Sequence, residues 1–371
     1  MMVVSKQHQI FFDFLRFCIG SAKDIPFSLK EADWEELYAI AQKQCLVGIL
    51  FDGIKKLPAE QVGMKKELLL QWMAESQMLE KANARLNDAA IQVSEWFLKK
   101  GFRTCILKGQ GNALMYPNSY SRTPGDIDIW VEGGDKRVIS FVRSISPHEK
   151  ACYHHIDFPS YKGVEVEVHY RPSFLLCFWH NRKLQKYYER VKEEQFSHRV
   201  MLGEQGEIAI PTAEFNLIFQ LTHIYAHLMN EGIGLRQLLD YYYVLISDDL
   251  LLIRDRVQNE LKELGLWKFA GGIMYIMQEV FGMPASRLIV PPNEKYGKFV
   301  LNEVLEAGNF GRHDARNRFG KSKLGHNLQR VYRDIRLVRY FPAEALCEPL
   351  FRVWHFFWRL KYRRQSLGVF S

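Results

Sequence analysis

The spacing of apolar residues divides the chain into a helical, a mixed and a second helical region. Between residues 64 and 100, apolar side chains recur every three or four positions with no proline among them, which predicts one long helix ending near Gly101. The same spacing predicts earlier helices at 7–20 and 30–55. After residue 210 it predicts further helices at 213–229, 235–246, 250–282, 295–306, 324–340 and 344–364.

In the middle region the pattern changes, and apolar and polar positions alternate. Four segments there suit an extended backbone: 102–107, 127–131, 151–158 and 164–170. With a helix at 135–146 between them, these segments predict a small mixed sheet. We therefore expect an α+β fold with three parts, an N-terminal helical region (1–100), an α/β core (101–208) and a C-terminal helical domain (209–371).

Composition and charge narrow the classes of protein. Apolar residues make up 47% of the chain, so we expect it to fold throughout. Lys and Arg number 50 against 42 Asp and Glu, a net charge of +8 that suits a polyanion such as a nucleotide, nucleic acid or anionic lipid, although many proteins without such partners are equally basic.

The cysteines and the apolar runs bear on location. The six cysteines are scattered, with no CxxC pair and no Cys/His spacing of the usual zinc-site kind, which predicts reduced thiols and a cytoplasmic protein. Charged residues interrupt the apolar stretch at the N-terminus and every other long apolar run, so we expect neither a signal peptide nor a membrane span.

Carboxylates at alternate positions of the predicted strands are the first candidates for chemistry. Asp126 and Asp128 share one face of the strand near 127–131, and Glu165 and Glu167 share one face of the strand near 164–170. Two or three converging carboxylates suit a pair of Mg²⁺ ions, which Mn²⁺ can replace, and such pairs serve phosphoryl and nucleotidyl transfer. We favour Glu167 as the third carboxylate, a metal ligand or proton acceptor, with Glu165 next and a merely solvated acidic sheet face as the alternative.

A glycine-punctuated segment precedes these aspartates. Gly109 and Gly111 allow the backbone to approach a triphosphate, while Lys108 and Arg122 can neutralise its charge, and Asn112 lies beside them. The order of residues differs from that of a Walker A loop.

Several other residues support two interpretations each. His169 either contacts the metal site or base or only binds a carboxylate, and His223 and His227 either ligate a metal or, as we favour, form a buried pair facing the cleft. Arg236 and Asp240 form either a local ion pair or a unit in which Asp240 orients Arg236 toward a phosphate.

The last predicted helix mixes aromatic and cationic residues from 351 to 364. We favour a helix docked on the core with a basic outer face, and the alternatives are contact with anionic lipid or stacking on RNA.

Two sets of residues resemble known enzymes. Gly111-Asn112, then thirteen residues, then Asp126-Ile127-Asp128-Ile129 resembles the signature of the DNA polymerase beta-type nucleotidyltransferase superfamily, with Asn112 in place of the usual serine. Over residues 65–246 the chain is more closely similar to an uncharacterised bacterial branch of these nucleotidyltransferases. The residues that carry this second resemblance are Ile106-Leu107-Lys108-Gly109, Tyr116-Pro117, Arg122, Asp126 and Asp128, Val166-Glu167-Val168-His169, His223, His227, Arg236 and Asp240.

The resemblance implies a polymerase beta-like core between helical regions and a metal-dependent transfer of NMP from an NTP, ATP by default, with release of pyrophosphate. The acceptor is left open among small molecules, proteins and RNA. The alternatives are an inactive nucleotide- or RNA-binding module, and a peripheral membrane or RNA-binding protein that acts through its basic C-terminal helix.

Overall fold

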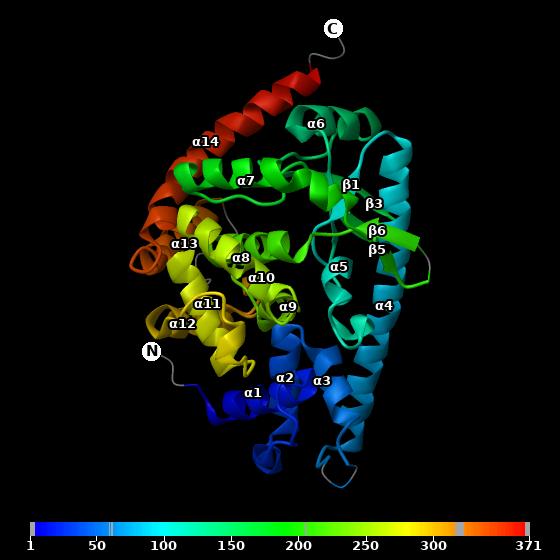
Figure 1. Ribbon diagram of the computed structural model, residues 1–371, viewed down its shortest axis with the longest axis vertical. Coiled ribbons are helices and arrows are strands. Elements are labelled where there is room, and N and C mark those ends of the chain that lie inside the picture. Colours follow the sequence, from blue (N-terminus) through cyan, green and yellow to red (C-terminus); the bar gives the residue numbers. More distant parts are fainter. Residues whose placement is uncertain are drawn as a thin grey trace.

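The computed structural model describes residues 4–58, 60, 62–204, 206–314, 316 and 323–367. Its N-terminal third is helical (Figure 1), with α1 (Lys6–Ile19), η1 (Phe27–Glu31), α2 (Trp34–Gln44), α3 (Val47–Ile54) and α4 (Lys66–Lys99). The predicted helix at 30–55 is two helices, because Cys45 adopts a left-handed conformation with φ 56° and ends α2. Asp33 starts α2 by accepting hydrogen bonds from the backbone N–H groups of Glu35 and Glu36.

A four-stranded sheet follows, in the order β1-β2-β4-β3. Its strands are β1 (Thr104–Ile106), β2 (Ile127–Val131), β3 (His155–Tyr161) and β4 (Val164–His169), with α5 (Gln110–Ala113), η3 (Ser119–Ser121) and α6 (Gly134–Ile145) between them. Strands β2 and β4 are parallel, and the other two pairs are antiparallel. Lys162 and Gly163 turn β3 into β4, and both adopt the positive φ that a two-residue hairpin loop requires.

Helix α7 (Phe178–Ser197) and the hairpin of β5 (Arg199–Leu202) and β6 (Gly206–Ala209) are not among the elements that the sequence pattern predicts. The apolar pattern does not predict α7 because its buried face includes the polar residues Asn181 and Gln195, which weaken the helical periodicity. Both polar side chains are used, since Asn181 accepts from the N–H of Leu175 and Gln195 from the N–H of Thr212.

The remaining chain is helical, as predicted: α8 (Ala213–Asn230), α9 (Leu235–Leu245), α10 (Leu250–Glu263), α11 (Trp267–Glu279), η4 (Ala285–Arg287), α12 (Glu294–Ala307), η5 (Asn309–Gly311), α13 (Lys323–Leu337) and α14 (Pro342–Leu367). The predicted helix at 250–282 is interrupted at Gly265, which has φ +69°. In Figure 1, α14 runs along the opposite side of the molecule from the long helix α4.

Two apolar clusters hold these elements together, and the sheet lies between them. One face of β2 places Ile127, Ile129 and Val131 in the smaller cluster with the C-terminal half of α4. The other face places Trp130 in the larger cluster, which joins α1, α2 and α3 to helices α8 to α12. Asp128 shares this second face, so the alternation of β2 directs it toward the helical part of the molecule.

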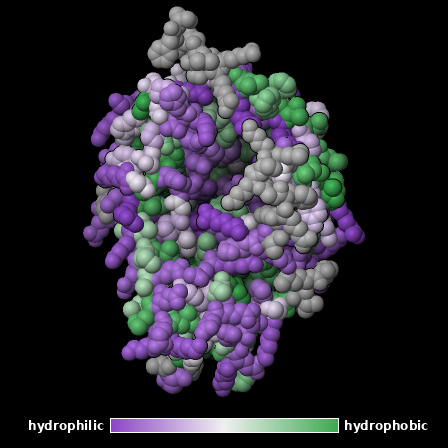
Figure 2. All heavy atoms as spheres, turned by 180° about the vertical axis from the view of Figure 1, so that it is seen from behind, coloured by the Kyte–Doolittle hydropathy of each residue, from purple (hydrophilic) through white to green (hydrophobic). Residues whose placement is uncertain are grey.

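The surface is mixed, and no described helix is both long and apolar enough to cross a membrane. Hydrophilic residues cover most of the face shown in Figure 2, with hydrophobic residues in smaller groups between them. The domain boundaries predicted near residues 100 and 208 stay predictions. The larger apolar cluster takes residues from both predicted helical regions.

Candidate functional site

The three predicted carboxylates converge at the centre of the sheet. Parallel pairing of β2 with β4 sets Asp128 opposite Glu167, and Asp126 lies just before β2 begins. One oxygen from each of the three carboxylates lies within 4.8 Å of the others, a grouping that could hold a metal ion. Glu165, two residues earlier on β4, is exposed and lies outside this group.

Asp128 is buried, and two cationic groups face its carboxylate. Oδ2 lies 3.0 Å from Nζ of Lys108, and Oδ1 lies 3.0 Å from Nε2 of His169. Burial alone would raise the pKa of Asp128, but the charge of Lys108 and the contact with His169 outweigh it and hold the pKa below its ordinary value. Burial would likewise lower the pKa of Lys108, and the surrounding carboxylates, Asp128 first, raise it instead.

Glu167 is ionised as well. Although burial would raise its pKa, a hydrogen bond from His169 and the charge of His155 lower the pKa of Glu167 to about 2. The two imidazoles lie 3.5 and 3.3 Å from Oε2 of Glu167. A carboxylate with so low a pKa is a weak base at neutral pH, so its role as a metal ligand is better supported than its role as a proton acceptor.

The glycine segment packs directly against the aspartates. Gly109 has φ +63°, and a Cβ built there would lie 3.6 Å from the backbone oxygen of Asp126. Gly111 instead faces Ile210, whose side chain lies 2.9 Å from a Cβ position at Gly111, so this glycine serves packing. Asn112 is buried, and its Oδ1 accepts hydrogen bonds from Asn216 and Gln220 of α8, each at 3.2 Å.

Asp240 binds a different arginine from the predicted one. Both of its oxygens accept from Arg122, each at 2.8 Å, and Tyr116 donates to Oδ1 at 2.6 Å. Neither interpretation of Arg236 and Asp240 named this partner, because the one-turn spacing on α9 could not reveal a residue 118 positions away. Among the charges that lower the pKa of Asp240 against the effect of burial, that of Arg122 comes first and that of Arg236 after it. Arg122, with its side chain 4% exposed, is engaged by this pair, and its role as a phosphate ligand stays a prediction.

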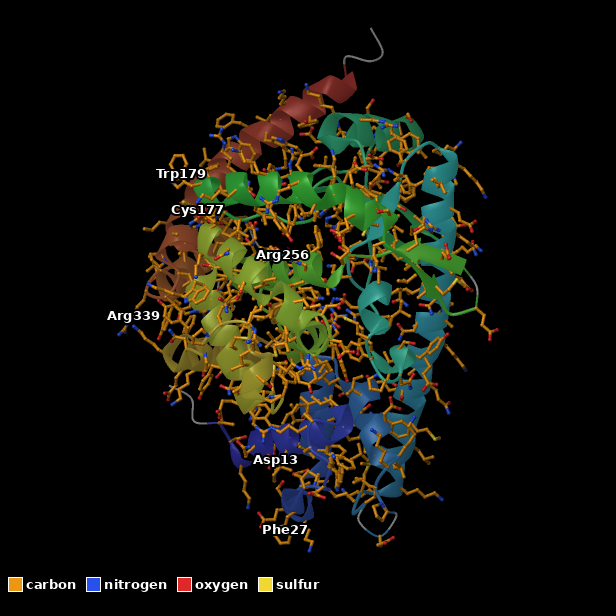
Figure 3. All side chains as sticks on the ribbon, in the orientation of Figure 1. Asp13, Phe27, Cys177, Trp179, Arg256 and Arg339 are labelled. Carbon is orange, nitrogen blue, oxygen red and sulfur yellow. The ribbon has the colours of Figure 1, made fainter. Side chains whose placement is uncertain are left out.

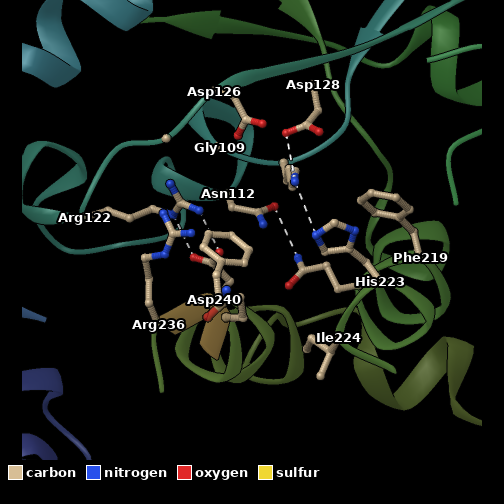
Figure 4. A pocket seen from close by; sticks show the side chains of 15 residues that line it. Gly109, Asn112, Arg122, Asp126, Asp128, Phe219, His223, Ile224, Arg236 and Asp240 are labelled. Atoms are coloured by element: carbon tan, nitrogen blue, oxygen red, sulfur yellow. Dashed lines mark hydrogen bonds and ion pairs between the residues drawn. The ribbon is translucent and has the colours of Figure 1, made fainter. Parts of the chain in front are cut away.

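Arg236 lies in the same pocket without a carboxylate of its own. Nη1 donates to the backbone oxygen of Thr123 at 2.9 Å, and Nε has no hydrogen-bond partner among the described residues. Burial and the charge of Arg122 lower the pKa of Arg236, against the opposite effect of Asp240. Figure 4 shows Arg236 beside the Arg122–Asp240 pair, across the pocket from Asp126 and Asp128.

The histidines of α8 also face the cleft. Nε2 of His223, labelled in Figure 4, lies 3.2 Å from Nζ of Lys108 and 3.0 Å from Nε2 of His227. Burial and the neighbouring charge of Lys108 hold the pKa of His223 well below its ordinary value. The pair is half-buried and lines the cavity, and it belongs to none of the possible metal-binding groups among the described residues, so the choice between a histidine pair and a metal site stays a prediction.

A cavity of about 710 Å³ adjoins the carboxylates and contains residues that the sequence reasoning missed. Cys152, His154 and His155 line it beside Glu167, and Phe310 lines both this cavity and the pocket of Arg236. Signals existed for the first three, since Cys152-Tyr153-His154-His155 is compact in sequence. The sequence holds no such signal for Phe310, because the turn after α12 places this residue at the cavity.

The C-terminal helix α14 docks on the core through part of its surface. Ala345, Phe351 and Tyr362 are buried, as the favoured interpretation of this helix requires. Its outer side, however, carries apolar residues as well as cations: Leu346, Leu350, Val353 and Phe357 are each about 60% exposed.

A family profile described as "Uncharacterised nucleotidyltransferase" matches residues 30–282, more than half of the chain. The chain belongs to this family. The match includes the whole sheet and all residues of the carboxylate site, so this α+β protein has a nucleotidyltransferase core between helices.

Other comparisons add little to the family assignment. No curated protein matches the nucleotidyltransferase chain significantly. Among solved structures, an antigenic nucleotidyltransferase-like protein from Paracoccidioides brasiliensis is 14% identical, and the alignment covers 51% of this chain and 91% of that one. Its TM-score of 0.27 is too low to carry an argument.

Proposed function

We propose that this nucleotidyltransferase transfers an NMP unit from an NTP to an acceptor. A nucleophile of the acceptor bonds to the α-phosphorus, the bond from that phosphorus to the bridging oxygen breaks, and pyrophosphate leaves. The observation that carries the proposal is the convergence of Asp126, Asp128 and Glu167 within 4.8 Å, beside a pocket that also holds Lys108 and Arg236.

The donor set fits Mg²⁺ or Mn²⁺. Asp126, Asp128 and Glu167 offer only carboxylate oxygens, which hard divalent cations prefer, and all three line the same cavity. When bound, one or two such ions would neutralise polyphosphate charge and favour attack at the α-phosphorus.

The other residues of the pocket would bind and position the nucleotide. Arg236 has donors that no carboxylate of the described chain occupies, so it is our candidate for a triphosphate contact. Lys108 is the second, since it reaches into both the pocket and the larger cavity. Gly109 lets the backbone pass close to Asp126. The walls of the pocket include Arg122, Asp240 and Asn112, which are fixed by hydrogen bonds.

The acceptor would enter the cavity of about 710 Å³, which is large enough for a small molecule or for a protruding group of a protein or RNA. ATP remains the default donor. A cytoplasmic location also stays a proposal, supported by six cysteines that form no disulfide.

The proposal is tested with α-labelled NTPs, Mg²⁺ or Mn²⁺ and cell extract. Asp126→Asn and Asp128→Asn keep the shape of the site but remove charge, and we expect each to lower label transfer roughly 1000-fold, the effect of losing several kcal/mol of transition-state stabilisation. Glu165→Gln, on the same strand as Glu167 but exposed, is the matched control and should transfer label normally.

Equal transfer by all four proteins would contradict the proposal. If no protein transfers label, calorimetry with each NTP and with RNA decides the alternative of an inactive binding module, which predicts binding without turnover.

A second candidate function rests on the exposed apolar row of α14. Leu346, Leu350, Val353 and Phe357 follow helical spacing, and the exposed cations Arg359 and Lys361 continue the same helix. Such a face suits an anionic membrane surface. We expect Leu350→Glu and Phe357→Glu to abolish sedimentation with phosphatidylserine vesicles, and unchanged sedimentation, or binding to RNA alone, would overturn this candidate.

A further inference from the structure

We propose that Cys152, His154 and His155 form a binding site for a divalent transition metal of the Zn²⁺ class. The usual zinc-site spacing is missing from the sequence, and the proposal rests instead on how the structure groups these three residues. Sγ of Cys152 and one ring nitrogen each of His154 and His155 lie within 4.8 Å of one another. The proposal is independent of nucleotidyl transfer, which uses the oxygen donors next to this site.

The distance between the two histidines suits two ligands of one small cation. In a tetrahedral zinc site, two ring nitrogens lie about 3.3 Å apart, and a sulfur and a nitrogen about 3.5 Å apart. Here Nε2 of His154 lies 3.1 Å from Nδ1 of His155, while Sγ of Cys152 lies 3.4 Å from the other ring nitrogen of His154, Nδ1. Only one nitrogen of His154 would bind the ion, and one donor atom from each of the three residues lies within 4.8 Å of the others.

The backbone fixes these side chains in one tight turn. Ala151 pairs with Ile156, and the N–H of Cys152 donates to the oxygen of His155 at 2.9 Å, so the turn is closed between the two ligands. The oxygen of His154 accepts from the N–H groups of Tyr170 and Arg171 at the end of β4. The backbone that carries the three donors is therefore held by the fold, and their side chains also contact one another.

One ligand has the outer support that metal-binding histidines usually show. Nε2 of His155 lies 3.6 Å from Oδ1 of Asp157, which leaves Nδ1 as the donor atom toward the cluster. A carboxylate behind an imidazole fixes its orientation and strengthens the nitrogen as a ligand.

Glu167 lies at the boundary with the carboxylate site. Its Oε2 is 3.3 Å from Nδ1 of His155, so it offers a fourth ligand or leaves that position open to the cavity. Three protein ligands with a position open to a cavity are typical of zinc sites that bind an exchangeable group. Nitrogen and sulfur donors also separate this site from its neighbour, because Mg²⁺ prefers oxygen.

The test uses the full chain, stripped of metal by a chelator and titrated with Co²⁺ in the absence of nucleotide. We expect one equivalent to bind and to give a thiolate-to-cobalt charge-transfer band that excess Mg²⁺ leaves in place and Zn²⁺ removes. Cys152→Ser should abolish the band, and His155→Gln should weaken Co²⁺ binding at least about 100-fold, beyond the loss of an outer-shell partner alone.

Cys177→Ser is the matched control, because Cys177, His180 and Glu344 form the rival group that also contains a thiol. This variant should keep the band. A band that survives Cys152→Ser, a band lost in Cys177→Ser, or no band at all would overturn the proposal.

The wild-type chain gives a second readout that does not depend on folding of a variant. Bound Zn²⁺ should slow alkylation of Cys152 by iodoacetamide at least about tenfold, as measured by peptide mass spectrometry, and an unchanged rate would also refute the site. If the metal-site proposal fails, the proposed nucleotidyl transfer is unaffected. That transfer is tested separately, by label transfer in the Asp126 and Asp128 variants.

Discussion

Asp128 shows how one residue depends on neighbours from three parts of the chain. Its carboxylate lies 3.0 Å from Lys108, which comes after β1, and 3.0 Å from His169 at the end of β4. Glu167 of β4 adds a second negative charge to the same place. Because a buried carboxylate is stable only when such partners compensate its charge, a metal ion arriving here would compete with Lys108 for the same oxygens.

The Arg122–Asp240 pair gives a prediction on stability. Both side chains are almost fully buried, so Arg122→Met leaves an uncompensated carboxylate, and we expect the free energy of unfolding to fall by about 3–5 kcal/mol. The double variant Arg122→Met/Asp240→Asn removes both charges and keeps an acceptor for Tyr116, so it should lose less. Urea denaturation measures both, and a double variant less stable than the single one would show that the pair does more than balance charge.

Arg236 gives a prediction on ligand binding. If it contacts the triphosphate, Arg236→Gln loses a charge-assisted hydrogen bond and should weaken NTP binding roughly 10- to 100-fold in calorimetry. Arg256→Gln is the control, because Arg256 lies on the surface and pairs with Glu214 (Figure 3). Equal nucleotide affinity in the two variants would remove Arg236 from the site.

For single residues, the sequence predicted which carboxylates converge better than it predicted which side chains bind one another. Asp126, Asp128 and Glu167 could be found because alternation fixes the face of a strand, and the structure does bring them together. The link from Asp240 to Arg122 could not be found, since it joins α9 to a loop far away in sequence. Cys152 and the adjacent histidines were visible as a motif but escaped because their spacing matches no common zinc pattern.

Among the elements, one strand pairing brings the candidate carboxylates of the sheet together. Strands β2 and β4 are parallel and adjacent, although β3 lies between them in sequence. Alternation within each strand was predictable, and the parallel register that sets Asp128 opposite Glu167 was not, because pairing depends on chain segments that pattern alone cannot align. Helix α7 escaped for another reason, since its buried polar residues obscure the apolar period.

The contact between α13 and α14 contains a pH-sensitive carboxyl group, that of Asp334. Burial, and then the charge of Glu348, raise the pKa of Asp334 from its ordinary 3.8 to about 7, while Arg352 and Arg333 act in the opposite direction. Between these two pKa values, the folded chain holds a proton that the unfolded chain has lost. The contribution of Asp334 to stability is therefore full below about pH 4 and decreases as the pH rises toward 7.

Asp334→Asn should remove this dependence. We expect the melting temperature of the variant, relative to wild type, to rise between pH 5 and 8, because the amide stays neutral throughout. Asp255→Asn on the exposed side of α10 is the control and should follow wild type. A constant difference between Asp334→Asn and wild type over this range would contradict the raised pKa.

For the whole molecule, the composition of the larger apolar cluster is the main constraint. It joins α1, α2 and α3 to helices after residue 210, so the two helical regions that the sequence separates share one core. A buried polar side chain connects them further. Gln44, at the end of α2, accepts from the N–H of Leu235 at 2.8 Å and donates to the oxygen of Val304 at 3.1 Å.

Gln44→Met tests whether this connection makes the chain one cooperative unit. The substitution leaves the N–H of Leu235 without its partner, while the oxygen of Val304 still accepts from Gly308, so we expect a loss of about 1–3 kcal/mol. Gln42→Met, on the exposed side of α2, should cost less, because Gln42 only binds Glu75 at the surface.

Far-UV circular dichroism reports all helices, and tryptophan fluorescence includes Trp34 and Trp72 of the N-terminal part. With one shared core, both signals should change at the same urea concentration in the wild type and in both variants. An earlier fluorescence change in Gln44→Met alone would mean that α1 to α3 separate from the nucleotidyltransferase core before that core unfolds.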